Sequence, residues 1–199
     1  MCRAGAGDDG SSMRNHRLRS VLRSAAAAGI GTLTLGLAVA SPAVAGTPKC
    51  PGADTPTSNV RVLQKTVLCL HNVDRHGLSK LTWNSDLSKA ASKHAHDMAS
   101  RHYFAHLSPE RHDHMDRIAA TGYKPAAGCW TAGENLFFST GPSTPRQVMS
   151  AWMHSPLHRQ NIMRKGWHDF ALGVATPSPS GDPDGITLVA LFGTRGGHC

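Results

Sequence analysis

The order of two apolar patterns constrains the fold of this chain most strongly. Between residues 59 and 163, apolar residues recur every three or four positions, which is the spacing of amphipathic helices. After residue 170 the pattern changes to short apolar runs bounded by glycine and proline, which is typical of strands. Helices followed by strands in this way predict an α+β fold in which helices cover an antiparallel sheet.

Capping residues, prolines at first helical positions and glycines after last turns set the expected boundaries. The expected helices are 59–76, one that begins near Asp86, 112–121, one that begins at Thr144-Pro145, and 156–163. The expected strands are 171–175 and 186–192, joined by a turn-rich segment into a hairpin, with 136–138 as a candidate third strand.

The first 45 residues have the pattern of an export signal. A basic segment with four arginines at 14–23 is followed by an uncharged, alanine-rich stretch at 25–40 and by the cleavage pattern Ala43-Val44-Ala45. A membrane anchor is the alternative, but the apolar stretch is short for a span and no stop-transfer charges follow it. We therefore expect a secreted protein with a signal peptide (1–45), a flexible lead-in (46–58) and a single domain (59–199). Met13 is an alternative start.

The charge balance argues against a nucleic-acid-binding protein. The full chain has 21 Lys and Arg against 13 Asp and Glu, a formal net charge of +8. Five arginines and two aspartates lie in the predicted signal, which leaves 16 basic and 11 acidic residues and a net charge of +5. The lysines and arginines form no run of the kind that follows a phosphate backbone. We expect a monomer without a nucleic-acid partner and without a stable membrane span in its mature form.

Four cysteines remain after the predicted signal, and an even number is typical of disulfides in exported domains. Four cysteines allow three pairings. We favour Cys50–Cys69, which would tie down the N-terminus, together with Cys129–Cys199, which would join the middle of the chain to its last residue. A zinc site built from all four is disfavoured because no CxxC pair occurs.

Four of the 13 histidines have a simple interpretation. His94-Ala95-His96 looks like a metal pair, but residues two apart on a helix point to nearly opposite faces. We therefore expect His94 in the core, where it is hydrogen-bonded, and His96 in solvent. His112-Asp113-His114 is interpreted as a solvated polar turn.

Three residues have a more specific context. His106 begins a loop that ends in Ser-Pro, Glu134 lies between a glycine and an asparagine before an apolar run, and His158 follows Ser155-Pro156. Two imidazoles and one carboxylate can hold a borderline cation such as Zn²⁺, with open positions for water or ligand. The same groups can act without metal as a general base and a proton shuttle. Spacing alone leaves both alternatives open.

Four segments around these residues resemble the signature blocks of the CAP superfamily (cysteine-rich secretory, venom-antigen and plant pathogenesis-related proteins). The bacterial SCP-like branch is the most similar. The blocks, in the family's order, are Asn72-x-x-Arg75 with Gly77-Leu78-x-x-Leu81-x-Trp83; Ala90-Ala91-x-x-His94-Ala95-x-Asp97-Met98 with Phe104-x-His106-x-Ser108-Pro109; Gly133-Glu134-Asn135; and Trp152-x-x-Ser155-Pro156-x-His158-Arg159-x-Asn161-Ile162 leading to Leu172-Gly173-Val174. They cover residues 60–192, nearly all of the expected mature chain.

The resemblance implies an α-β-α sandwich with a central antiparallel sheet and a cleft that carries two histidines and two glutamates. His106, Glu134 and His158 match three members of this tetrad, which binds Zn²⁺ in some relatives. Ser155 stands in the place of the second glutamate, so we expect weaker or water-completed metal binding, or none. Asn135, Ser155 and Arg159 complete the predicted ligand-binding cleft.

Two functions of different classes follow. The first is a secreted binding module for a small molecule, lipid, glycan, cell-wall component or peptide, with or without a divalent metal. It is favoured because the sequence has neither a Gly-x-Ser-x-Gly elbow nor an HExxH helix. The second is an extracellular hydrolase in which Glu134 is the candidate base and the histidines hold metal or supply a proton. We favour binding, because a fold resemblance does not fix the chemistry.

Overall fold

The computed structural model describes residues 50–196, which all lie within one compact unit, residues 43–199. The predicted signal peptide and Cys199 lie outside the described residues. The elements are α1 (Val60–Asp74), β1 (Thr82–Trp83), α2 (Ser85–Ser100), α3 (His114–Ala119), β2 (Cys129–Ser139), α4 (Pro145–His154), α5 (Pro156–Ile162), β3 (Asp169–Ala175) and β4 (Ile186–Gly196).

The sheet has four strands in the order β1-β3-β4-β2. Strand β4 pairs antiparallel with β3, as the hairpin pattern predicts, and also with β2. The sheet is mixed, however, because the two-residue strand β1 runs parallel to β3. Strand β2 is also longer than the expected run 136–138, since its ladder with β4 continues to Cys129.

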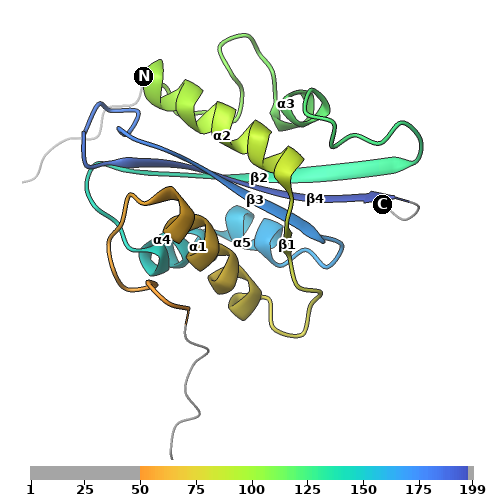
Figure 1. Ribbon diagram of the computed structural model, residues 1–199, viewed down its shortest axis with the longest axis horizontal. Helices are drawn as coiled ribbons and strands as arrows, with labels where there is room; N and C mark the ends of the chain where they lie inside the picture. Colours follow the sequence, from red (N-terminus) through yellow and green to blue (C-terminus); the bar gives the residue numbers. More distant parts are fainter. Residues whose placement is uncertain (1–49, 197–199) are drawn as a thin grey trace, which may run out of the picture. The chain divides into compact units, whose positions relative to one another are not determined.

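Helices cover both faces of this sheet, so the α-β-α sandwich is confirmed. Figure 1 shows α2 and α3 on one face and α1, α4 and α5 on the other. Successive residues of a strand point to opposite faces, and β4 follows this rule. Leu188, Ala190 and Phe192 join the core beneath α1, α4 and α5, whereas Val189 and Leu191 join the core beneath α2.

Local capping explains most helix boundaries. Asn84 caps α2 by accepting hydrogen bonds from the backbone amides of Asp86 and Leu87. The third helix is shorter than the expected 112–121, because Asp113 forms a capping box with Asp116 and so starts the helix at His114. Within residues 50–196, no helix combines the length and the apolar character needed to cross a bilayer.

The N-terminal part of the described chain is attached to α1. The predicted Cys50–Cys69 disulfide is confirmed, with a Cα–Cα distance of 5.8 Å. The lead-in packs on the domain from Cys50 onwards, and Ala53 lies in the core. Cys129 stands opposite Gly196 in the β2–β4 ladder, three residues before the end of the chain. Because Cys199 lies outside the described residues, Cys129–Cys199 stays a prediction.

A buried arginine joins the end of α1 to the chain that follows α5. Arg75 donates hydrogen bonds to the carbonyl oxygens of Ile162 (2.5 Å), Arg164 (2.9 Å) and Trp167 (3.3 Å). Ser79 supplies a fourth carbonyl at 3.0 Å. One guanidinium therefore fixes the backbone of segment 162–167. Residues 163–165 of this segment line a cleft.

Small residues allow α2 to approach β3 closely. Gly173 faces α2, and a Cβ added there would overlap the backbone carbonyl of Ala91. We expect Gly173→Ala to lower the free energy of unfolding by about 1–3 kcal/mol, because the extra methyl group meets backbone that cannot rotate away. Urea unfolding measures this change. Gly141→Ala is the control, since an added Cβ there meets nothing within 4 Å, and equal losses in both variants would contradict the packing described.

Candidate functional site

Three sequence-predicted residues from three separate elements meet at one cleft. His106 comes from the loop between α2 and α3, Glu134 from β2 and His158 from α5. All three line an open cleft of about 840 Å³. The other lining residues are Asn135, Leu157, Gln160, Asn161, Met163, Arg164 and Lys165.

The strand register explains how β2 serves this cleft. Glu134 stands opposite Leu191, whose side chain lies in the core beneath α2, whereas Asn135 stands opposite Ala190 in the other core. Because opposite residues in a ladder share a face of the sheet, Glu134 faces the α2–α3 layer and Asn135 faces the α1–α4–α5 layer. β2 is an edge strand, so both side chains reach the cleft beside it.

The Glu134 carboxylate is buried and has a nitrogen donor on each oxygen. Its side chain is 1% exposed, with His106 Nδ1 at 2.9 Å from Oε1 and Arg117 Nη2 at 2.7 Å from Oε2. Burial on its own would raise the pKa of Glu134, but the His106 hydrogen bond and the Arg117 charge outweigh it and hold the pKa below 4.5. Glu134 is therefore ionised at neutral pH. Since an ionised carboxylate only accepts, His106 Nδ1 carries the proton.

Arg117, at the C-terminal end of α3, fixes both Glu134 and the loop that carries His106. Its Nη1 donates to the carbonyl oxygens of His106 (3.0 Å) and His112 (2.7 Å), while Nη2 bonds Glu134. A planar guanidinium can make these bonds together, which a lysine cannot. Sequence reasoning missed this residue, because its carboxylate partner lies 17 residues away on a strand.

The two imidazoles differ in their surroundings. The His106 side chain is 56% exposed, and because Nδ1 is bound to Glu134, its Nε2 is the ring nitrogen that a ligand can meet. Burial, and then the nearby charge of His106, lower the pKa of His158 below 6.5. His158 is therefore a neutral imidazole at neutral pH.

Asn135 links β2 to α5. Its Nδ2 donates to the carbonyl oxygen of His158 at 3.1 Å, and its Oδ1 accepts from Asn161 Nδ2 at 3.1 Å. A Cβ at Gly133 would overlap the Asn161 side-chain amide, so a larger residue there would require the asparagine side chain to shift. In the block Gly133-Glu134-Asn135, the glycine leaves room for Asn161 of α5, the glutamate supplies the buried carboxylate of the cleft, and the asparagine bonds the backbone of His158.

The structure does not bring Ser155 and Arg159 to this cleft. Ser155 is the N-cap of α5, and neither it nor the exposed Arg159 is among the lining residues. Two cations that sequence reasoning missed, Arg164 and Lys165, line the cleft instead. The Arg164 guanidinium carbon lies 4.4 Å from the centre of the Trp167 ring, a cation–π contact that helps to hold it in place.

The residues present do not fit the Zn²⁺ site formed by His106, Glu134 and His158. Each Glu134 oxygen already accepts a hydrogen bond, from His106 Nδ1 and from Arg117, so coordination by the carboxylate would compete with Arg117, whereas His106 Nε2 stays open to a ligand. Across residues 50–196, His, Cys, Asp and Glu side chains form no group of three or more that could hold a metal ion.

A buried histidine of α2, His94, holds the loop that carries His106. His94 is buried, as predicted, and its Nε2 lies 3.0 Å from the carbonyl oxygen of Ala105, the residue before His106. Burial lowers the pKa of His94 below 6.5, so it holds the loop as a neutral group. His96 is exposed, also as predicted.

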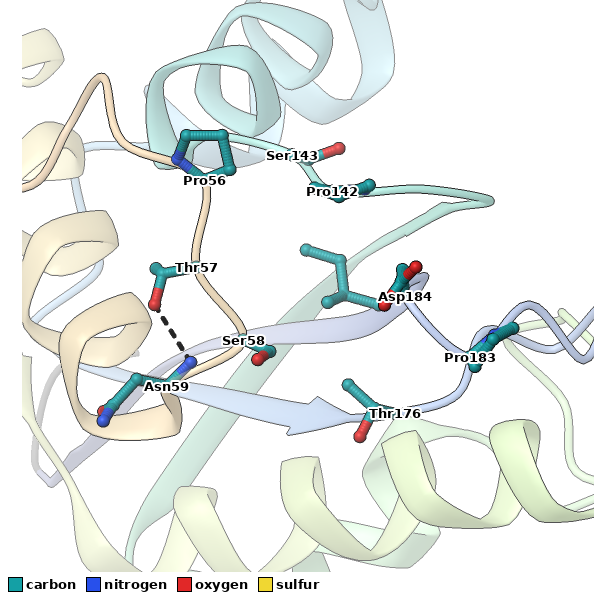
Figure 2. A pocket seen from close by; sticks show the side chains of 10 residues that line it. Pro56, Thr57, Ser58, Asn59, Pro142, Ser143, Thr176, Pro183 and Asp184 are labelled. Atoms are coloured by element: carbon teal, nitrogen blue, oxygen red, sulfur yellow. Dashed lines mark hydrogen bonds between the residues drawn. The ribbon is translucent and has the colours of Figure 1, made fainter.

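A second hollow lies near the N-terminus of α1. It has a volume of about 450 Å³ and includes Thr57, Asn59 and Asp184 among its lining residues. Figure 2 shows the hydrogen bond from the Asn59 backbone amide to the Thr57 hydroxyl, at 3.0 Å. None of the sequence-predicted site residues lines this hollow.

Comparison with known proteins links the sequence blocks to one family. The family described as the cysteine-rich secretory protein family (CAP) has a model that matches residues 57–192. The uncharacterised protein YkwD of Bacillus subtilis (strain 168) is 36% identical over 120 residues, which covers 58% of this chain and 44% of that protein. The match thus spans less than half the length of this curated relative.

Two solved structures share the fold. An extracellular protein containing an SCP domain from Bacillus anthracis str. Ames has a TM-score of 0.55 at 23% identity, covering 66% of this chain and 40% of that one. An outer surface protein from Borrelia burgdorferi has a TM-score of 0.56 at 19% identity, covering 66% of this chain and 92% of that one. At these identities the likeness is one of fold.

The electrostatic effect of His106 on His158 gives a direct test of their proximity. We expect the His158 ring to titrate below 6.5, and His106→Gln to raise its pKa part of the way back, because burial is the larger cause. Proton NMR of the ring Cε1–H signals measures both values. His154→Gln, on the exposed end of α4, is the control and leaves His158 unchanged. If the His158 pKa were the same in the wild type and in His106→Gln, this would contradict the proximity of the two rings.

Proposed function

Because the chain belongs to the cysteine-rich secretory protein (CAP) family, we propose that it is an extracellular binding module whose ligand occupies the cleft between His106 and His158. The convergence of polar side chains from three separate elements at one open cleft of about 840 Å³ carries this proposal. A concave site with a few convergent polar groups is the usual form of a ligand site.

An extracellular location is supported by two features. The Cys50–Cys69 disulfide is typical of proteins that fold in an oxidising compartment. The pattern of residues 1–45 predicts export by a cleaved signal. The stable, prefolded cleft would then meet its ligand outside the cell.

Binding is favoured over hydrolysis by the chemistry of the lining. Among the described residues that line the cleft there is no serine, threonine or cysteine to act as a nucleophile. Glu134, the predicted base, would have to release His106 or Arg117 before it took a proton. The carboxylate is thus better suited to holding its neighbours than to catalysis.

A hydrolase is the second candidate, and one observation favours it. The hydrogen bond from His106 Nδ1 to Glu134 leaves Nε2 free to take a proton from water. In this candidate His106 is the base and Glu134 orients it, which differs from the role that the sequence suggested for Glu134.

An untargeted mass-spectrometric survey of protein secreted by its native host tests the proposal. We expect the wild-type protein to carry a co-purifying molecule that is lost in the double variant His106→Ala/His158→Ala, because both rings line the cleft. The matched control is His96→Ala/His154→Ala, which removes two exposed histidines from α2 and α4. This control retains the molecule.

Two results would contradict the binding proposal. One is an identical set of co-purified molecules in the wild type and the His106→Ala/His158→Ala variant. The other is turnover of peptide or cell-wall substrates that Glu134→Gln abolishes while circular dichroism shows an intact fold, since this would establish the hydrolase.

A further inference from the structure

We infer that the cleft selects a ligand with an anionic group, a phosphate or a carboxylate, and that Arg117 makes it unsuitable for a divalent cation. The inference rests on the proposed function, because it names the ligand class of the same cleft. The charges of the lining residues carry this inference.

Glu134 is the only acidic residue among the described residues that line the cleft. Glu134 is paired with Arg117 at 2.7 Å, and His106 occupies its second oxygen. Charge-assisted hydrogen bonds of this kind are among the strongest in proteins. Arg117 is itself only 11% exposed and is tied to two loop carbonyls, so it cannot swing away at little cost. Glu134 therefore offers almost no net negative charge to a cation.

The other charged side chains on the described lining are cations. Arg164 and Lys165 are exposed on the lining, and none of the ion pairs in the described part of the chain includes either residue. With Glu134 neutralised from within, the field in the cleft is positive. A guanidinium beside an ammonium group is the usual protein partner of phosphate and carboxylate.

The backbone that carries these cations is held in place by hydrogen bonds. Segment 162–167 is held by the hydrogen bonds of Arg75 to three of its carbonyls, and Arg164 stacks on Trp167. The guanidinium is therefore positioned before a ligand arrives, which reduces the entropy lost on binding. Leu157, which is 77% exposed, and Met163 offer apolar contact nearby, so the ligand joins its anionic group to an apolar part.

Titration of the mature chain with inorganic phosphate and, separately, with acetate tests the anion site. Backbone amide NMR at low salt is expected to show saturable shifts at Arg164 and Lys165, and the tighter of the two anions identifies the preferred head group. Arg164→Gln/Lys165→Gln is expected to weaken binding by about tenfold or more, because two charge-assisted hydrogen bonds are lost.

Arg61→Gln/Lys65→Gln is the matched control for this double variant. It removes the same two charges from exposed positions on α1, at a separate hollow beside Trp83. Since the net charge changes equally, a loss of anion binding that is confined to the Arg164→Gln/Lys165→Gln variant shows a local site. Equal losses in both pairs would overturn the inference, because they would show only a general charge effect.

Calorimetric titration with Zn²⁺ alone tests the role of Arg117. We expect the wild type to bind no zinc through the cleft. Arg117→Gln leaves the Glu134 charge uncompensated, so zinc affinity rises by about tenfold or more while phosphate affinity falls. Circular dichroism checks that this variant folds. If its loop is disturbed, the surface variant Arg164→Gln/Lys165→Gln still decides the anion site.

Three outcomes overturn the inference: no saturable binding of either anion, anion binding that survives Arg164→Gln/Lys165→Gln, or tight zinc binding by the wild type that His106→Gln abolishes. The proposed function fails on a different result, the loss of any dependence of co-purified ligand on His106 and His158. A neutral ligand that depends on both histidines would leave the binding module standing and overturn the anion site alone.

Discussion

Glu134 is the residue on which the cleft depends. Burying a carboxylate costs several kcal/mol unless it is paired and hydrogen-bonded, and this one is 1% exposed. His106 and Arg117 meet that requirement with one donor for each oxygen. The same two donors belong to the loop and to α3, so the need to satisfy one buried charge fixes the position of both segments over β2.

The cleft lies where the two helical layers meet beside an edge strand. Glu134 and Asn135 are neighbours on β2 and therefore face opposite layers. Glu134 holds the loop from the α2–α3 layer through His106, and Asn135 holds α5 from the other layer through the His158 carbonyl oxygen. One dipeptide thus brings together two imidazoles that are far apart in sequence. Arg75 fixes the backbone next to the cleft by donating hydrogen bonds to the carbonyl oxygens of residues 162, 164 and 167.

Much of this arrangement could be predicted from the sequence, because short local patterns determine it. Caps and Pro start signals located the helices, and the order of the blocks pointed to His106, Glu134 and His158. The parallel strand β1 was missed because two residues show no periodicity. Arg117 was missed because its position on a short helix gives no indication of its partner on β2, and Arg164 and Lys165 were missed because tertiary bonds from Arg75 place them. Arg159 is exposed and does not line the cleft, because it follows His158 on α5 and adjacent helical residues point about 100° apart.

The ionisation of Glu134 is the most direct test of its pairing with His106 and Arg117, and ¹³C NMR of its side-chain carboxyl measures it. We predict a pKa below 4.5 for Glu134, because the two donors outweigh burial. If the pKa of Glu134 is lower in the folded than in the unfolded chain, its pairing with His106 and Arg117 stabilises the fold at pH values above the unfolded pKa. This contribution is lost as the pH falls through the folded pKa. A measured pKa above 4.5 would mean that burial prevails, and that the pairing of Glu134 with Arg117 and His106 does not hold in solution.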